Sequence, residues 1–375
     1  MSDLLYSEEE EALRSAVRGL LADRCDATAV LARVETGRPH DRELWKALGD
    51  GMGLAGLLVP EELGGQGATH REAAVVLEEL GRAVAPVPYL TSAVVATEAL
   101  LACVEGEGGG AAEGSPAAEA AELLGAMACG RTVGALAVGF AAAPGAPFVS
   151  VRHEGGALHG ELTGIADASC ADVLLVPADG ALYAVDTDQD GVTVTPQTSL
   201  DLTRPLATAT FDAAHARALT RNADAAVRRG LRAGAALLAS EQLGLADWCL
   251  TETVRYTKER HQFNRPVGSF QALKHRLAQL WLEVVNTRAA ARNAADALAS
   301  GSQDADVATA LAQAYASPVA VRAAEEALQL HGGIGMTWEH PVHLCLKRAK
   351  ADSIGCGTAG RHREALADLV DLRAP

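Results

Sequence analysis

The amino-acid sequence predicts an α+β protein with an N-terminal α-helical domain (1–130), a central β domain (131–220) and a C-terminal four-helix-bundle domain (221–375). Apolar residues recur at helical intervals up to about residue 130 and again from residue 223. Between these parts, short β-prone segments are separated by Gly, Asp and Pro. At 375 residues, 49% of them hydrophobic, the chain has material for two to three cores.

The first helices are predicted from caps and periodicity. Ser7 and Glu10 have the spacing of a capping box, and apolar residues follow at helical intervals. Further helices are expected over Asp41–Gly51, His70–Ala83, Tyr89–Val104 and Pro116–Cys129. The acidic, glycine-rich stretch 105–114 is expected to be a loop.

The central and C-terminal parts differ in the length of their segments. Strands are expected over Phe148–Val151, Val173–Pro177, Leu182–Val185, Val192–Thr195 and Ala207–Phe211. Long helical runs are expected over about 223–258, 270–300, 303–331 and 340–371.

Charge and composition exclude several classes of function. With 32 basic and 48 acidic side chains the net charge is −16, which argues against a nucleic-acid partner. The longest uncharged stretch, Thr132–Val151, is interrupted by Gly and Pro, so no membrane span is expected. The acidic N-terminus is unlike a signal peptide, and we expect a cytoplasmic protein. The seven Cys show no metal-ligand spacing, so no metal site is predicted.

Two clusters carry chemical signals. In residues 257–276 a helix end, a Pro-Gly turn and a new helix bring several cations together, which favours a phosphate-like anion; the alternative is an ordinary solvated corner. In residues 326–337 three glycines follow a helix, which permits close approach of backbone to a ligand; the alternative is a plain glycine cap.

Together these clusters resemble the acyl-CoA dehydrogenase family. Its R-x-x-F-x-x-x-[IV]-x-x-F-Q stretch corresponds to Arg260, Phe263, Val267, Phe270 and Gln271. Its Q-x-x-G-G-x-G stretch corresponds to Gln329, Gly332, Gly333 and Gly335, followed by Glu339 and Pro341. Residues 58–67, L-V-P-E-E-L-G-G-Q-G, are similar to the family's P-E-x-x-G-G-x-G loop, and the α–β–α order agrees.

The resemblance implies FAD-dependent α,β-dehydrogenation of an acyl-CoA thioester, in which a carboxylate removes the α-proton and hydride passes to the flavin. It implies that a homologous subunit, in a dimer or an α2β2 tetramer, shares the FAD site, and that an electron-transfer flavoprotein accepts the electrons. The implied contacts to the neighbouring subunit's FAD are Arg260, Phe263, Gln271, Gln329, Gly332 and Gly333. Thr358 matches the family threonine that touches its own subunit's FAD.

Three features of the family are missing. Its T-E-P stretch corresponds to residues 139–147, which have no Thr-Glu-Pro, and its flavin-contacting W-I-T stretch corresponds to Gly164-Ile165-Ala166. The catalytic carboxylate is absent from both usual places, which hold Cys356 and Gly234. A thiol, with an ordinary pKa of ~8.5, is a poor base at neutral pH. Glu241 shares a helical face with position 234 and is the remaining candidate base.

The missing features serve a subunit's own flavin and substrate, whereas the retained ones serve its neighbour's FAD. The leading interpretation is therefore a catalytically degenerate partner subunit, resembling those of actinobacterial heteromeric acyl-CoA dehydrogenases. Two alternatives stay open. One is a self-sufficient homomeric dehydrogenase that uses Glu241, and the other is a non-catalytic scaffold without flavin.

Overall fold

The computed structural model describes residues 4–106 and 114–372, and the elements follow the order helices, strands, helices. The N-terminal part contains α1 (Glu8–Arg24), α2 (Ala27–Val34), α3 (Arg42–Lys46), α4 (His70–Ala83), α5 (Thr97–Gly106) and α6 (Pro116–Ala128). A π-helical segment, Tyr89–Ala96, leads into α5. The C-terminal part contains α7 (Ala223–Glu259), α8 (Gln271–Ala299), α9 (Ala305–His331), α10 (Val342–Asp352) and α11 (Ala359–Leu369).

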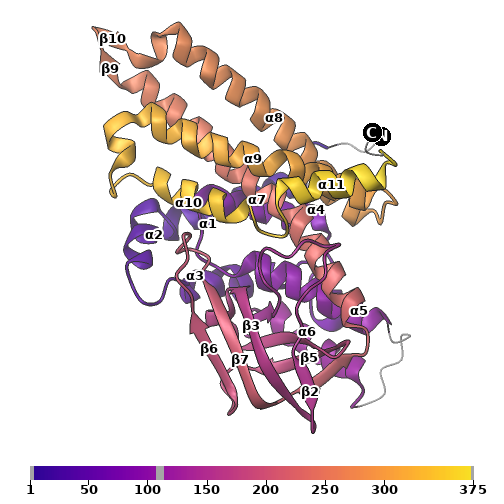
Figure 1. Cartoon of the computed structure of the whole chain (residues 1–375). Coiled ribbons are helices and arrows are strands. Elements are labelled where there is room, and N and C mark those ends of the chain that lie inside the picture. The colour runs from indigo at the N-terminus through magenta and orange to yellow at the C-terminus, as the bar shows by residue number, and fades with distance from the viewer. Residues whose placement is uncertain (1–3, 107–113, 373–375) are drawn as a thin grey trace.

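Two four-stranded sheets form the central part, below the C-terminal helices in Figure 1. One has the order β1–β4–β5–β8, with strands Gly134–Leu136, Val173–Ala178, Ala181–Asp186 and Arg217–Thr220. The other has the order β2–β3–β7–β6, with strands Arg152–Glu154, Ala157–Ala166, Leu206–His215 and Val192–Pro196. A short hairpin, β9 (His261–Gln262) and β10 (Arg265–Pro266), joins α7 to α8 at the far end of the bundle (Figure 1).

The capping box at the start of α1 is confirmed. Ser7 Oγ accepts from the backbone N–H of Glu10 at 3.1 Å, and the Glu10 carboxylate accepts from the N–H of Ser7 at 2.6 Å. The helix expected over His70–Ala83 has those bounds, and the other expected N-terminal helices are present with small shifts. Part of the predicted loop 105–114, residues 107–113, lies outside the described residues.

We expect Ser7→Ala to lower the free energy of unfolding by about 1 kcal/mol, because the backbone N–H of Glu10 loses the side-chain oxygen that caps it. Ser15→Ala, at an exposed position inside the same helix, is the matched control and should change stability by less than about 0.5 kcal/mol. Denaturant titration of the variants provides the comparison. Equal effects of the two substitutions would show that the cap contributes nothing.

Three predictions about elements are wrong. No strand covers Phe148–Val151, since the strand there begins at Arg152. Strands β1, β3 and β8 are absent from the prediction; β3 contains register shifts between Leu158 and His159 and between Leu162 and Ile165, which disrupt the period-two pattern. The run 340–371 is two helices, because Cys356 and Gly357 have positive φ, outside the helical region.

Helix α7 is the central helix and approaches α4 very closely. A Cβ added at Gly244 of α7 would overlap the carbonyl oxygen of Glu78, and one at Gly81 of α4 would overlap that of Glu241. The two helices therefore meet backbone to backbone, and Glu241 is buried beside this contact. The helical stretch Tyr89–Gly106 is apolar and long enough to cross a bilayer, but 78% of it is buried within the protein, as in a core helix.

Candidate functional site

The three segments that lack the family's flavin and substrate residues meet in space. The loop after β1 is joined to β3 by a hydrogen bond from Phe140 N to Gly164 O at 2.8 Å. The same loop is joined to the turn between α10 and α11 by a bond from Cys356 N to Phe140 O at 2.7 Å. The Phe140 ring lies so close to Gly355 that a Cβ there would be 2.5 Å from it. Backbone and an aromatic ring thus fill the space between Gly164 and the turn 355–356.

The two positions that the resemblance assigns to the catalytic base, 234 and 356, are neighbours. A Cβ built at Gly234 would lie 3.3 Å from Cys356 Sγ and 2.7 Å from a methyl carbon of Val95. Burial raises the pKa of the Cys356 thiol to about 12, so it stays protonated at neutral pH. Neither position offers a group that could take the α-proton of a thioester.

Little space is left around these positions. A cavity of about 30 Å³ lies there, lined among others by Phe140, Ala166, Leu231 and Cys356. That volume holds about one or two water molecules. A flavin ring or an acyl thioester does not fit in this cavity, so the space beside Cys356 does not match the group that the resemblance implies.

The structure gives Glu241 a structural role instead of a catalytic one. Its side chain is buried, and its two oxygens accept from Arg204 Nη2 and Arg348 Nη1, each at 2.6 Å. Burial alone would raise the pKa of this carboxyl, but the two guanidiniums outweigh burial and lower it. With both oxygens occupied and a low pKa, Glu241 has neither the free lone pair nor the basicity that proton abstraction requires.

Further groups extend this ion-pair cluster between the sheets and the bundle. Arg204 also donates to Asp352 Oδ1 at 2.8 Å, and Arg348 donates to Asp201 and to Thr203 Oγ1. Burial and the neighbouring Glu241 raise the pKa of Asp352 well above its ordinary range. The cluster links the segment after β6 to α7 and α10, and it lay beyond sequence analysis because its members are far apart in the chain.

The residues expected to contact a neighbour's FAD lie on the surface. Arg260, Phe263, Gln271, Gln329, Gly332 and Gly333 are all exposed. Phe263 is at the tip of the β9–β10 hairpin and is 86% exposed. Phe263 and Asn264 both have positive φ, the backbone of a two-residue hairpin turn, although neither residue is glycine. Such backbone strain at an exposed aromatic residue is characteristic of functional sites.

Side-chain contacts bring the two clusters to the same end of the bundle. Tyr256, in the last turn of α7, stacks on His331 at the end of α9 with ring centroids 4.5 Å apart. Arg276 of α8 pairs with Glu326 of α9 at 2.7 Å. The turn 329–333 therefore lies beside the end of α7 and the start of α8. Within the described residues, the Arg260 guanidinium has no ion-pair partner.

Thr358 has a local structural contact. It is exposed, and its hydroxyl caps α11 by accepting from Arg361 N at 3.3 Å.

A cavity of about 860 Å³ borders the same region, between the loop 143–147 and helices α7, α9 and α11. Its arginines already have partners, with Arg228 on Asp224 at 2.7 Å and Arg232 on Asp306 at 3.4 Å. The sequence analysis did not predict this cavity. Arg228 and Arg232, four residues apart on one face of α7, are the signal that could have indicated it.

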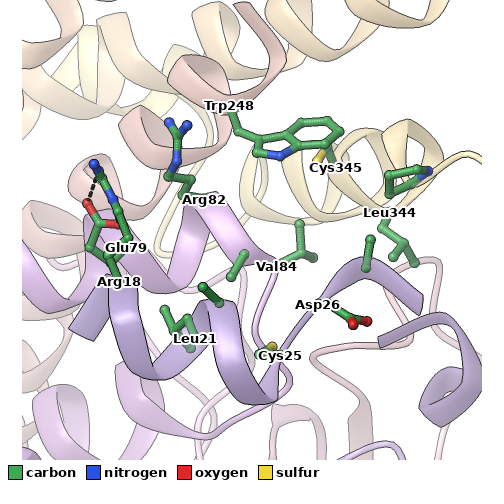
Figure 2. Close-up of a pocket in the computed structure, with 14 residues that line it drawn as sticks. Arg18, Leu21, Cys25, Asp26, Glu79, Arg82, Val84, Trp248, Leu344 and Cys345 are labelled. Carbon is green, nitrogen blue, oxygen red and sulfur yellow. Dashed lines mark hydrogen bonds and ion pairs between the residues drawn. The ribbon is translucent and has the colours of Figure 1, made fainter. Parts of the chain in front are cut away.

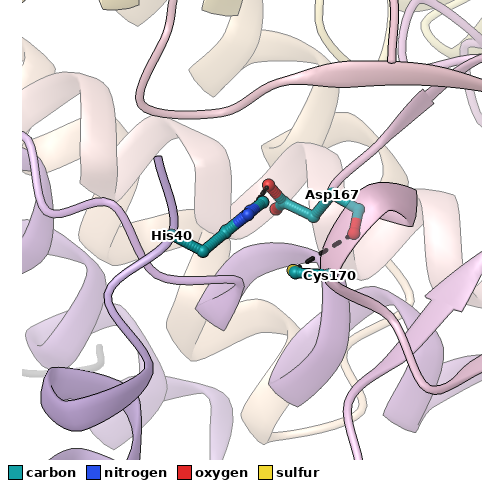
Figure 3. Close-up of side chains that lie close together, drawn as sticks. All are labelled: His40, Asp167 and Cys170. Atoms are coloured by element: carbon teal, nitrogen blue, oxygen red, sulfur yellow. Dashed lines mark hydrogen bonds and ion pairs between the residues drawn. The ribbon is translucent and has the colours of Figure 1, made fainter. Parts of the chain in front are cut away.

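Two other polar sites have their groups satisfied internally. Figure 2 shows a pocket of about 240 Å³ between α1, α4, α7 and α10, in which Arg18 pairs with Glu79 at 2.6 Å. Figure 3 shows His40 beside Asp167 and Cys170; His40 Nε2 lies 2.8 Å from Asp167 Oδ1, and Thr91 donates to the other oxygen at 2.7 Å. The His40–Asp167 contact joins the N-terminal helices to the sheets.

Comparison with known proteins shows which family the chain is similar to. The family models for the acyl-CoA dehydrogenase N-terminal and C-terminal domains match residues 7–105 and 224–370. Acyl-CoA dehydrogenase IpdE2 of Mycolicibacterium smegmatis is 37% identical over 92% of this chain and 93% of its own. The ChsE4–ChsE5 complex from Mycobacterium tuberculosis contains a chain similar over the full length of both, with TM-score 0.85 and 28% identity. The Tcur3481–Tcur3483 steroid ACAD variant is 29% identical, with TM-score 0.82, over 97% of this chain and 98% of its own.

The chain belongs to the acyl-CoA dehydrogenase family. The resemblance and the fold class predicted from sequence are thereby confirmed, and FAD is the cofactor that this membership assigns.

Proposed function

We propose that this chain is the subunit of a heteromeric FAD-dependent acyl-CoA dehydrogenase that completes the FAD site of a homologous partner. The observation that carries the proposal is the contrast between the two sites. The cavity beside Cys356, one of the two positions that the resemblance assigns to the catalytic base, has a volume of only about 30 Å³. The residues that serve a neighbour's FAD are exposed at one end of the bundle, and Arg260 there is without an ion-pair partner among the described residues.

The chemistry of these exposed groups suits a nucleotide cofactor. A guanidinium offers paired donors to a pyrophosphate, and the amides of Gln271 and Gln329 offer donors and acceptors to adenine and ribose. Gly332 and Gly333 have no side chain, so a ligand can approach their backbone closely. The space beside each is open, because a Cβ there would meet nothing within 4 Å in this chain. Bound FAD supplies the hydride acceptor, and this chain's residues bind and orient its nucleotide end.

Similar proteins support a heteromeric assembly. The ChsE4–ChsE5 and Tcur3481–Tcur3483 structures are each named as pairs of chains, and the second is named a steroid enzyme. We infer an acyl-CoA substrate bound by the partner, within a dimer or an α2β2 tetramer, and an electron-transfer flavoprotein as acceptor. The self-sufficient homomer loses its base, because Glu241 is held between two arginines. A non-catalytic scaffold without flavin is the second candidate function. The cavity of about 30 Å³ supports this candidate as much as it supports the partner subunit.

Production of the chain alone and together with a homologous subunit that retains the catalytic carboxylate tests the proposal. We expect the single chain to be colourless and inactive, and the complex to hold FAD and dehydrogenate acyl-CoA substrates. Flavin absorbance per chain and acceptor reduction are the measurements. A yellow, active single chain would overturn the proposal, and a stable complex without flavin would favour the scaffold.

Within the complex, Arg260→Ala should weaken FAD retention by about tenfold or more, because a charge-assisted hydrogen bond contributes about 1.5–3 kcal/mol. Lys258→Ala, an exposed cation two residues earlier, is the matched control and should leave retention unchanged. Flavin released on dilution is measured by fluorescence. An equal loss in both variants would indicate a general charge effect instead of a contact.

A further inference from the structure

His331, the last residue of α9, has an unused ring nitrogen in the interior. The side chain is 2% exposed, and Nδ1 lies 2.6 Å from the carbonyl oxygen of Ala327. A carbonyl only accepts, so Nδ1 carries the proton and Nε2 presents a lone pair. Nε2 is buried and has no hydrogen-bond partner among the described residues. An unsatisfied buried acceptor costs about 1–3 kcal/mol, which calls for a ligand.

Two further potential ligands lie close to His331 and come from other segments. Glu252 comes from α7 and His340 from the segment that leads into α10. One ligand atom from each of Glu252, His331 and His340 lies within 4.8 Å of the others. The His331 and His340 rings are in contact, with centroids 4.4 Å apart. Three parts of the chain thus converge on one point near the turn 329–333.

These ligands suit a transition metal. Two imidazoles and one carboxylate match the nitrogen and oxygen ligands of Zn²⁺. Bond lengths of about 2.0–2.1 Å place tetrahedral ligand atoms about 3.3 Å apart, so modest side-chain rotation closes the set. The fixed Nδ1–H···O=C bond of His331 is the outer contact that commonly orients a metal-bound histidine.

The other two ligands have competing contacts that an ion must displace. Both oxygens of Glu252 accept from Arg255, at 2.5 and 3.0 Å, but the arginine side chain is 57% exposed, so water can replace Glu252 as its partner. His340 Nδ1 accepts from Val342 N at 3.3 Å, a long bond that the ring gives up when Nε2 coordinates. Both side chains are partly exposed, which leaves a path for an ion and a position for water.

We propose that Glu252, His331 and His340 form a binding site for a divalent transition metal, with Zn²⁺ as the best match. Bound metal ties the end of α7 to the end of α9 and to the segment before α10. It thereby fixes the glycine turn 329–333, which the protein presents at its surface. The site stands on this chain's own residues and does not depend on the proposed role in FAD binding.

Zinc titration of the full chain, stripped with a chelator, tests the site by calorimetry with Zn²⁺ alone. We expect one ion per chain, and an affinity at least about tenfold lower in His340→Ala and in Glu252→Gln. His275→Ala, at an exposed position on α8, and Glu259→Gln, which removes the other partner of Arg255, are the matched controls and should bind as the parent does. His331→Ala is avoided because its ring packs in the interior.

Two further readouts separate the site from surface chelation. Co²⁺ should give the visible absorption of a low-symmetry four-coordinate ion in the parent and not in His340→Ala. Zn²⁺ should raise the Tm of the parent more than that of His340→Ala. Parent and His340→Ala binding equally, or no stoichiometric binding by the parent, would overturn the proposal.

Discussion

Glu241→Gln should lower the free energy of unfolding by about 3–5 kcal/mol, because it leaves two buried guanidiniums facing a neutral amide. Arg204 and Arg348 are both almost fully buried and each donates to one oxygen of Glu241 at 2.6 Å. Arg204 keeps Asp352 and Arg348 keeps Asp201 as ion-pair partners, but the cluster loses the carboxylate that the two guanidiniums share. Denaturant unfolding of the parent and the variant measures the loss.

Two controls sharpen this prediction. Glu325→Gln removes an exposed pair with Lys350 and should cost less than about 1 kcal/mol. The folded pKa of Glu241 lies below its unfolded value of ~4.3, so its contribution is present above that value and is lost as pH falls through the folded pKa. The gap between parent and variant should therefore narrow below about pH 4. In the complex produced with the partner subunit, the Glu241→Gln variant should keep an unchanged turnover per bound FAD. Loss of turnover would show that the catalytic base belongs to this chain.

Gly234→Glu should lower the free energy of unfolding by roughly 3 kcal/mol or more and should not create a dehydrogenase. The added Cβ alone would lie 2.7 Å from Val95, and overpacking of this kind costs about 1–3 kcal/mol. The carboxylate would enter an apolar cavity of about 30 Å³, where an unpaired charge adds a further penalty.

The matched control for this substitution is Gly19→Glu on the exposed face of α1, where a Cβ would meet nothing within 4 Å. It should be neutral or slightly stabilising, because glutamate is the better helix former. Unfolding curves, flavin absorbance and acyl-CoA dehydrogenation are compared for both variants. A folded, yellow and active Gly234→Glu protein would contradict a filled active-site junction.

Elements with a strong local signal could be predicted, and those shaped by tertiary contacts could not. The helix His70–Ala83 and the long runs that became α7, α8 and α9 follow from apolar periodicity over many turns. Strand β3 was missed because its two register shifts break the alternation. The break between α10 and α11 depends on positive φ at Cys356, a conformation that a residue other than glycine adopts only in a specific environment.

Glu241 illustrates the limit for the candidate site. In sequence it was one carboxylate on a helical face near the position of a missing base. Its partners Arg204 and Arg348 are 37 and 107 residues away, and no local pattern links them. His331 illustrates the same limit. Its Nε2 has no hydrogen-bond partner among the described residues, and Glu252 and His340 lie close to it, and both facts depend on tertiary packing.

By itself, the sequence determined the family and the α–β–α order, and it shows that positions 234 and 356 hold no carboxylate, because these depend on residue identity and local periodicity. Only the tertiary structure decided that the positions around Gly234 and Cys356 enclose almost no space and that Glu241 is an ion-pair partner. The physical reason is that cavity volume, burial and charge pairing arise from residues distant in sequence, whose effects appear only when the chain has packed.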